Sequence, residues 1–133
     1  LCYTGEPRNS GTNNWEITKR HIDGDQFIFD CFERIRDTAA RMRIALAAGD
    51  WDEVGRSIGE EWDNRKRLAP GVTTPGIDDL IARAKAAGAT AAKVCGAGGG
   101  GCLFCYGPPA AREAIRTALV DGGARLLDYT FER

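Results

Sequence analysis

The sequence lacks several features that would restrict its functional class. It has no run of apolar residues long enough to span a bilayer, and no charged-then-apolar leader that ends in a cleavage site. Its formal net charge is -1, so no overall field attracts nucleic acid or an anionic membrane. We therefore expect a cytoplasmic protein whose partners include neither nucleic acid nor a membrane.

Histidine is almost absent, and cysteine is present in an odd number. The five cysteines occur in a chain large enough to fold without disulfides, which favours reduced thiols. Cys102 and Cys105 form a C-x-x-C pair with Cys95 seven residues before Cys102, but strand residues three apart point to opposite faces, so no metal site is predicted. The one histidine, His21, has no Ser or Cys nucleophile near it in sequence, which argues against catalysis.

Length and composition are those of one globular domain. The 133 residues, of which 43% are hydrophobic and 28% charged, suffice for a buried core without metal or disulfide staples. No repeat, low-complexity tract or internal linker divides them, so residues 1–133 are predicted to form a single domain. The chain opens on Leu1, without a methionine and in a strand-like stretch, and we expect it to be a piece of something longer.

The hydrophobic pattern changes between helical and strand periods along the chain. Apolar residues at spacings of three and four predict a helix from Ile28 to Leu46 that ends at Gly49. The same pattern, with caps at Asp50 and Thr74, predicts further helices, and short apolar or alternating runs predict strands. The predicted segments are a strand at 1–5, a polar loop at 6–14, a helical turn from 15, helices at 28–46, 51–62, 75–87 and 108–121, and strands at 91–96, 102–107 and 124–132.

This order of elements favours one fold class. With two helical crossovers and one hairpin, the economical packing is an α+β ferredoxin-like sandwich. It has a four-stranded antiparallel sheet with helices packed on one face, and extra helices before the second strand. On the helix at 51–62 and just beyond it, Glu60, Glu61 and Asp63 have no obvious partners in sequence, so a solvated face is expected there.

A glycine-rich loop joins the second and third predicted strands, and five of its six residues from Gly96 to Gly101 are glycine. No Lys-Ser or Lys-Thr pair follows, and a strand follows instead of a helix, which excludes a Walker loop and a dinucleotide fingerprint. The loop is either a flexible hairpin without a ligand, or a place where another backbone, a ligand or a partner domain approaches too closely for a Cβ atom. A two-residue turn needs only one or two glycines, so the excess favours close approach.

The loop and its flanks, KVCGAGGGGCL at residues 93–103, resemble the third conserved motif of the GHMP kinase superfamily. The first residues resemble the start of the C-terminal domain in the sugar-kinase branch of that superfamily, near the heptose-7-phosphate kinases. This second stretch is YTGEPRNSGTNNWEITKRHIDGD, residues 3–25. The resemblance implies a ferredoxin-like C-terminal domain whose glycine motif lies at the domain junction. It also implies ATP and Mg²⁺ as cofactors, held mainly by an N-terminal domain whose motifs this chain does not contain. Support of the ATP-binding phosphate loop is then assigned to Gly96, Ala97, Gly98, Gly99, Gly100 and Gly101.

Polar and basic residues follow the first predicted strand. Their amide, hydroxyl and guanidinium groups suit hydrogen bonding to sugar hydroxyls or phosphate, although a solvated loop would carry the same residue types. In the family this segment points toward the domain junction, which favours the binding role. The residues predicted to bind substrate are Arg8, Asn9, Ser10, Asn13, Asn14, Lys19 and Arg20.

The leading functional hypothesis is the C-terminal domain of an ATP-dependent GHMP-type sugar kinase. It implies phosphoryl transfer to a hydroxyl of a sugar or sugar phosphate, with heptose 7-phosphate as a candidate, and no activity of this domain without an N-terminal partner domain. The alternative is a non-catalytic ferredoxin-like module that binds a small metabolite or forms a homodimer. RNA binding is disfavoured, because the central strands lack aromatic residues interleaved with basic ones.

Overall fold

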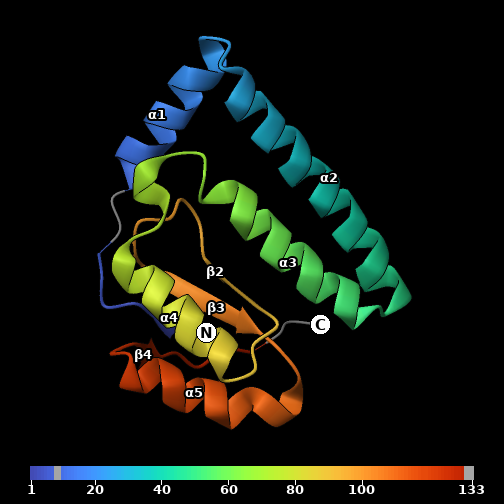
Figure 1. Cartoon of the computed structure of the whole chain (residues 1–133), viewed down its shortest axis with the longest axis vertical. Coiled ribbons are helices and arrows are strands. Elements are labelled where there is room, and N and C mark those ends of the chain that lie inside the picture. Colours follow the sequence, from blue (N-terminus) through green and yellow to red (C-terminus); the bar gives the residue numbers. More distant parts are fainter. Residues whose placement is uncertain (8–9, 131–133) are drawn as a thin grey trace.

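The computed structural model describes residues 1–7 and 10–130. Figure 1 shows how the helices and strands of these residues are arranged. In chain order the elements are β1 Cys2–Tyr3, α1 Ser10–Ile22, α2 Gln26–Ala48, α3 Trp51–Arg65, the 3-10 turn η1 Pro70–Val72, α4 Pro75–Ala86, β2 Ala91–Val94, β3 Cys102–Tyr106, the 3-10 turn η2 Pro109–Ala111, α5 Arg112–Asp121 and β4 Arg125–Leu126. None of the described helices has the length and apolar character needed to cross a membrane.

The long helices begin and end at residues that favour such boundaries. The Asp25 side chain accepts hydrogen bonds from two amides in the first turn of α2, and Gly49 ends that helix in the left-handed conformation, with φ of 70°. Asp50 and Thr74 cap α3 and α4 through their side-chain oxygens. The structure confirms the helices predicted at these positions.

The four strands form one antiparallel sheet in the order β2-β3-β1-β4. β1 lies between β3 and β4, with Cys2 opposite Leu103 on one side and opposite Leu126 on the other. β2 and β3 form a hairpin in which Val94 also lies opposite Leu103. Strand order and direction are those of a ferredoxin-like α+β sandwich, so the predicted fold class is confirmed.

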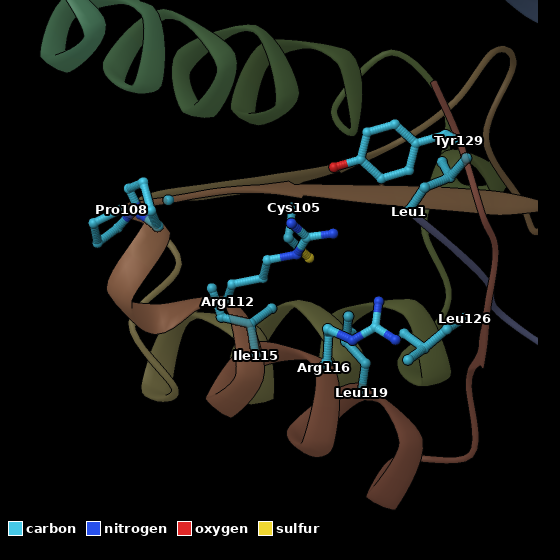
Figure 2. Close-up of a pocket in the computed structure, with 11 residues that line it drawn as sticks. Leu1, Cys105, Pro108, Arg112, Ile115, Arg116, Leu119, Leu126 and Tyr129 are labelled. Carbon is cyan, nitrogen blue, oxygen red and sulfur yellow. The ribbon is translucent and has the colours of Figure 1, made fainter. Parts of the chain in front are cut away.

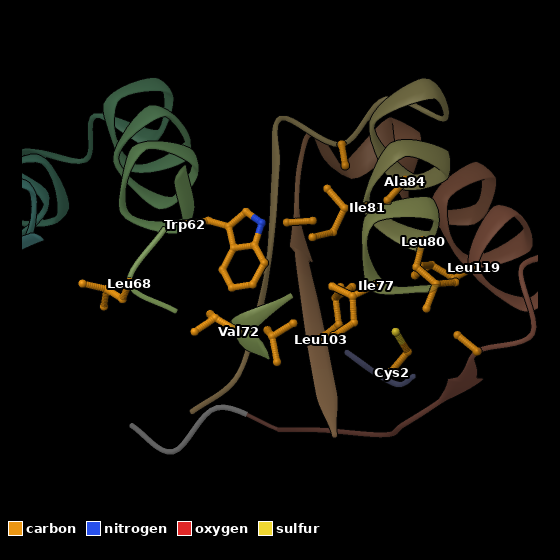
Figure 3. Packing of buried hydrophobic residues seen from close by; sticks show 14 of the residues in the cluster. Cys2, Trp62, Leu68, Val72, Ile77, Leu80, Ile81, Ala84, Leu103 and Leu119 are labelled. Atoms are coloured by element: carbon orange, nitrogen blue, oxygen red, sulfur yellow. The ribbon is translucent and has the colours of Figure 1, made fainter. Parts of the chain in front are cut away.

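Helices lie against both faces of the β2-β3 hairpin. On one face Ile77 of α4 joins Val94 and Leu103 in the main hydrophobic core, to which Leu119 of α5 also belongs (Figure 3). On the other face Ile58 of α3 clusters with Ala91, which points away from Val94 because the two are three residues apart on a strand. The sequence predicts helices packed on one face of the sheet, and this is the face that α4 and α5 cover. The extra helices α2 and α3 lie on the opposite side.

Two predicted segments differ most from the structure. Residues 10–14, predicted as loop, form the start of α1, which the burial of Asn13 and Ile17 stabilises against the poor helix propensity of its first residues. The last strand is limited to Arg125–Leu126, because β1 offers only Cys2–Tyr3 for pairing. The predicted strand at 124–132 was thus too long, and its last two residues lie outside the described part of the chain.

Candidate functional site

The glycine-rich loop closes the hairpin between β2 and β3. The amide of Cys95 donates a hydrogen bond to the carbonyl oxygen of Cys102 at 2.8 Å, so the loop itself comprises residues 96–101. All five of its glycines have a positive φ, between 74° and 138°. Residues with a Cβ atom rarely adopt such angles, so the course of this backbone requires glycine.

Two other segments of the chain lie in contact with the loop. The amide of Gly99 donates a hydrogen bond to the carbonyl oxygen of Val72 in η1 at 2.9 Å. A Cβ atom at Gly98 would overlap that same carbonyl oxygen, and one at Gly100 would lie 2.7 Å from the carbonyl oxygen of Glu6. The close approach predicted from the sequence is therefore an approach of the domain's own backbone.

Glu6 and Asn13 connect the neighbours of the loop to one another. Glu6 accepts a hydrogen bond from the amide of Gly101 through its carbonyl oxygen, and another from Thr74 Oγ1 through its carboxylate, each at 2.8 Å. Asn13 Nδ2 donates to the carbonyl oxygen of Gly71 at 2.7 Å. The segment after β1, the first turns of α1 and η1 thus converge on the glycine-rich loop.

Two of the predicted substrate-binding residues hold other segments of the domain through hydrogen bonds to backbone carbonyl groups. Asn13 is buried and holds η1 through the hydrogen bond just described. Arg20 donates to the carboxylate of Asp25 and to the carbonyl oxygen of Leu68. The hydrogen bond from Arg20 is the main reason that the pKa of Asp25 is lowered. These contacts hold α1 in position, and this structural role of Asn13 and Arg20 does not depend on any contact with a substrate.

Of the other predicted binding residues, two are exposed on α1 and two lie outside the described part of the chain. Asn14 is exposed on α1, and Lys19 is exposed in an ion pair with Asp23. Ser10 is the first residue of α1. Arg8 and Asn9 lie outside the described residues. Substrate binding by this set stays a prediction.

A largely buried ion-pair cluster lies on the strand that leads into the loop. Lys93 of β2 donates to the carboxylate of Glu61 on α3, which also accepts a hydrogen bond from Arg65. The side chains of Lys93 and Glu61 are only 18% and 10% exposed. Glu60 and Asp63 are exposed, as the predicted solvated face requires. The prediction is wrong for Glu61, which is buried, because it considered only neighbours in sequence and Lys93 is distant in sequence.

The remaining candidates do not form a catalytic group. Within residues 1–7 and 10–130, no three His, Cys, Asp or Glu side chains lie together as metal ligands would. The His21 ring stacks on Phe29, with ring centroids 4.2 Å apart, and meets Phe32 edge-on. These contacts give His21 a packing role where α1 meets α2.

A separate cavity of about 260 Å³ lies between β3, α5 and the C-terminal segment. Figure 2 shows Arg112 and Arg116, which are one turn apart on α5, beside this space, together with the apolar side chains of Ile115 and Leu119. The cavity also touches Cys105, near the end of β3, whereas the glycine-rich loop lies before the start of that strand. It is therefore distinct from the loop site.

The fold and the loop together define a class of domain: a ferredoxin-like sandwich whose glycine-rich hairpin loop is fixed between η1 and the segment after β1. The family described as GHMP kinases C terminal matches residues 42–125. This match covers most of the chain, including the glycine-rich loop. The chain belongs to the GHMP kinase family, as a C-terminal domain.

Two relatives of known activity are kinases. Mevalonate kinase of Pyrococcus abyssi is 39% identical over 128 residues, which are 94% of this chain and 38% of that protein. D-glycero-alpha-D-manno-heptose 7-phosphate kinase of Campylobacter jejuni is 24% identical over 110 residues, which are 83% of this chain and 32% of that protein. The chain spans about a third of the length of these relatives.

A solved structure shows the same fold. The Lin0012 protein from Listeria innocua superposes with a TM-score of 0.90 at 20% sequence identity. The superposition covers 99% of this chain and 38% of that one. At this level of identity the similarity establishes the fold.

Proposed function

We propose that this chain is the C-terminal domain of an ATP- and Mg²⁺-dependent kinase that phosphorylates a hydroxyl group of a small molecule. Family membership supports a kinase domain. The observation that carries the proposal further is the glycine-rich loop, whose backbone is held in place by Val72 and Glu6. Fixed backbone dipoles that need no reorganisation are what a phosphoryl-transfer site requires.

Unused amides in the loop support contact with phosphate. The amides of Gly99 and Gly101 donate inside the domain, whereas those of the three successive residues Gly96, Ala97 and Gly98 donate to no backbone carbonyl of the described residues. Successive backbone amides of this kind form concave anion-binding surfaces. In the proposed kinase the exposed Gly96 and the half-buried Ala97 present this run of amides to the phosphate-binding loop of the N-terminal domain or to the phosphate groups themselves.

Phosphoryl transfer also needs groups beyond this loop. It needs a cradle for the phosphates, a Mg²⁺ ion that neutralises their charge, and a group that orients the acceptor hydroxyl. We assign the cradle and the Mg²⁺ site mainly to an N-terminal GHMP domain, which is the required partner in this proposal. The residues of this chain hold the glycine-rich loop in position at the junction with that domain.

The proposed acceptor is a small anionic alcohol, and specifically a sugar phosphate such as heptose 7-phosphate. The names of the two kinase relatives include both mevalonate and a heptose 7-phosphate, which each combine hydroxyl groups with an anionic group. Polar groups on α1 and before it suit such a molecule. The residues proposed to bind it directly are Arg8, Asn9, Ser10, Asn14 and Lys19, with Asn13 and Arg20 holding α1 in place.

The kinase proposal predicts that the 133-residue chain alone turns over no ATP, whereas the chain joined to its N-terminal GHMP domain phosphorylates an anionic sugar. ADP release is measured with heptose 7-phosphate and, in parallel, with mevalonate. Removing Mg²⁺ with EDTA is expected to abolish turnover, because charge on the transferred phosphoryl group is then no longer neutralised. Turnover of mevalonate alone would correct the acceptor. A joined protein that is inactive with both acceptors would contradict the proposal.

A second candidate function is binding of a small anionic metabolite, and the cavity of Figure 2 favours it. Arg112 and Arg116 could bind a phosphate or carboxylate group over an apolar floor. Titration of the chain with inorganic phosphate is then expected to show binding that weakens roughly tenfold in Arg112→Ala, as for a lost charged hydrogen bond. Arg36→Ala, on the exposed side of α2, is the matched control. Equal affinity of both variants would exclude this cavity.

A further inference from the structure

Two cysteines lie opposite each other at the base of the glycine-rich loop. The register that pairs Val94 with Leu103 continues by one residue, so Cys95 lies opposite Cys102, and their backbones share the hydrogen bond of 2.8 Å. Directly opposed residues of antiparallel strands project from the same face of the sheet. Both cysteines are free and partly exposed. Their thiols are therefore neighbours that small reagents can reach.

The geometry of such a pair allows a disulfide after a small shift. Opposed residues of antiparallel strands have Cα atoms about 4.5–5.5 Å apart, which lies within the range of natural disulfides. The Cβ atoms of a hydrogen-bonded pair are about 5.5 Å apart, against about 3.8 Å in a disulfide. Closing the bond would draw the ends of β2 and β3 together by more than roughly 1 Å, and the resulting strain makes the bond easy to reduce.

We propose that Cys95 and Cys102 form a reversible disulfide that regulates the glycine-rich loop, an inference that rests on the proposed kinase function. The oxidant is a low-molecular-weight disulfide such as oxidised glutathione. One cysteine thiolate attacks a glutathione sulfur, forms a mixed disulfide and releases one glutathione thiolate. The second cysteine thiolate attacks the protein sulfur of the mixed disulfide and releases the other. The two glutathione thiolates take up the two protons that the cysteines lose.

The loop cannot follow this shift without losing contacts. Gly98 lies against Val72 and Gly100 lies against Glu6, and neither position has room for a Cβ atom. Drawing Cys95 and Cys102 together therefore displaces the loop from its neighbours. In the whole kinase, a displacement of about 1 Å beside the transferred phosphoryl group is expected to lower kcat roughly tenfold or more.

The other sheet cysteines are poorer candidates and serve as controls. Burial raises the pKa of the Cys105 thiol to about 12 and also raises the pKa of Cys2, which keeps both thiols protonated at neutral pH. Burial, followed by the nearby Cys102, raises the pKa of Cys95 as well. Since the thiolate is the attacking species, formation of the bond is expected to become faster as the pH rises above neutrality.

The test for the bond uses the 133-residue chain equilibrated with mixtures of reduced and oxidised glutathione. After free thiols are alkylated, the intact mass is expected to show one disulfide, removed by dithiothreitol, in the wild type and in Cys105→Ser. Cys95→Ser and Cys102→Ser are expected to lack it. In peptide maps, cleavage after Phe104 places Cys105 on a different peptide from Cys95 and Cys102. A disulfide between other cysteines overturns the proposal. The absence of any disulfide in excess oxidised glutathione overturns it as well.

The test for regulation uses the kinase with its N-terminal domain. Oxidation is expected to lower turnover roughly tenfold, and dithiothreitol to restore it, while Cys95→Ser stays active in both conditions. Unchanged turnover in a protein whose Cys95–Cys102 bond is confirmed by mass overturns the regulatory role. A reduced protein without any kinase activity instead refutes the proposed function, and the mass measurement still decides whether the bond forms.

Discussion

Replacing Gly98 by alanine is expected to destabilise the domain by about 2–5 kcal/mol, a large part of a typical folding free energy. The backbone at Gly98 has φ of 85°, which costs about 1–2 kcal/mol for a residue with a Cβ atom. The added atom would also overlap the carbonyl oxygen of Val72 and lie 2.8 Å from its Cγ1. Overpacking of this kind adds about 1–3 kcal/mol. Urea unfolding followed by circular dichroism measures the loss.

Gly24→Ala is the matched control for this variant. Gly24 has φ of 83°, close to that of Gly98, but no heavy atom lies within 4 Å of the position that its Cβ would occupy. The free energy of unfolding of Gly24→Ala is therefore expected to fall only by the backbone contribution of about 1–2 kcal/mol. The difference between the two variants therefore measures the contact between loop and η1. Equal losses would contradict the inference that η1 holds the loop in place.

The contact of Gly98 with Val72 also marks the limit of what the sequence could predict about the site. An excess of glycine between two strands indicates close approach of some group, and that interpretation is correct. The identity of the approaching group was open, because Val72 lies far from the loop in sequence. Only the folded chain brings η1 and Glu6 to the loop, through contacts that span many residues.

The first helix shows a second limit of the same kind. Ser10, Gly11 and Asn13 are weak helix formers and common in turns, so local propensity predicted a loop. In the structure the buried Ile17 and the hydrogen bond from Asn13 to η1 fix these residues as helix. In contrast, α2 to α4 could be predicted because each combines an apolar stripe with a local cap, two features that neighbouring residues supply.

Replacing Lys93 by methionine is expected to destabilise the domain by about 3 kcal/mol, the lower end of the range for breaking a buried ion pair. The variant leaves the carboxylate of Glu61, whose side chain is 10% exposed, with Arg65 as its remaining cation. Arg65 is 32% exposed and offsets part of the loss. Lys19→Met, which breaks the exposed pair with Asp23, is the control, with an expected loss of about 0–1 kcal/mol.

The double variant Lys93→Met with Glu61→Met decides how this pair acts. Two apolar side chains of similar volume are often as stable as a buried ion pair, so the double variant is expected to recover most of the stability that Lys93→Met loses. A double-mutant cycle by urea unfolding would then give a large coupling energy. Additive losses would show instead that close packing, and not the ion pair, holds α3 against the sheet. Gly55 of α3 offers that alternative, since a Cβ atom there would lie 2.8 Å from Cγ2 of Thr90, the residue before β2.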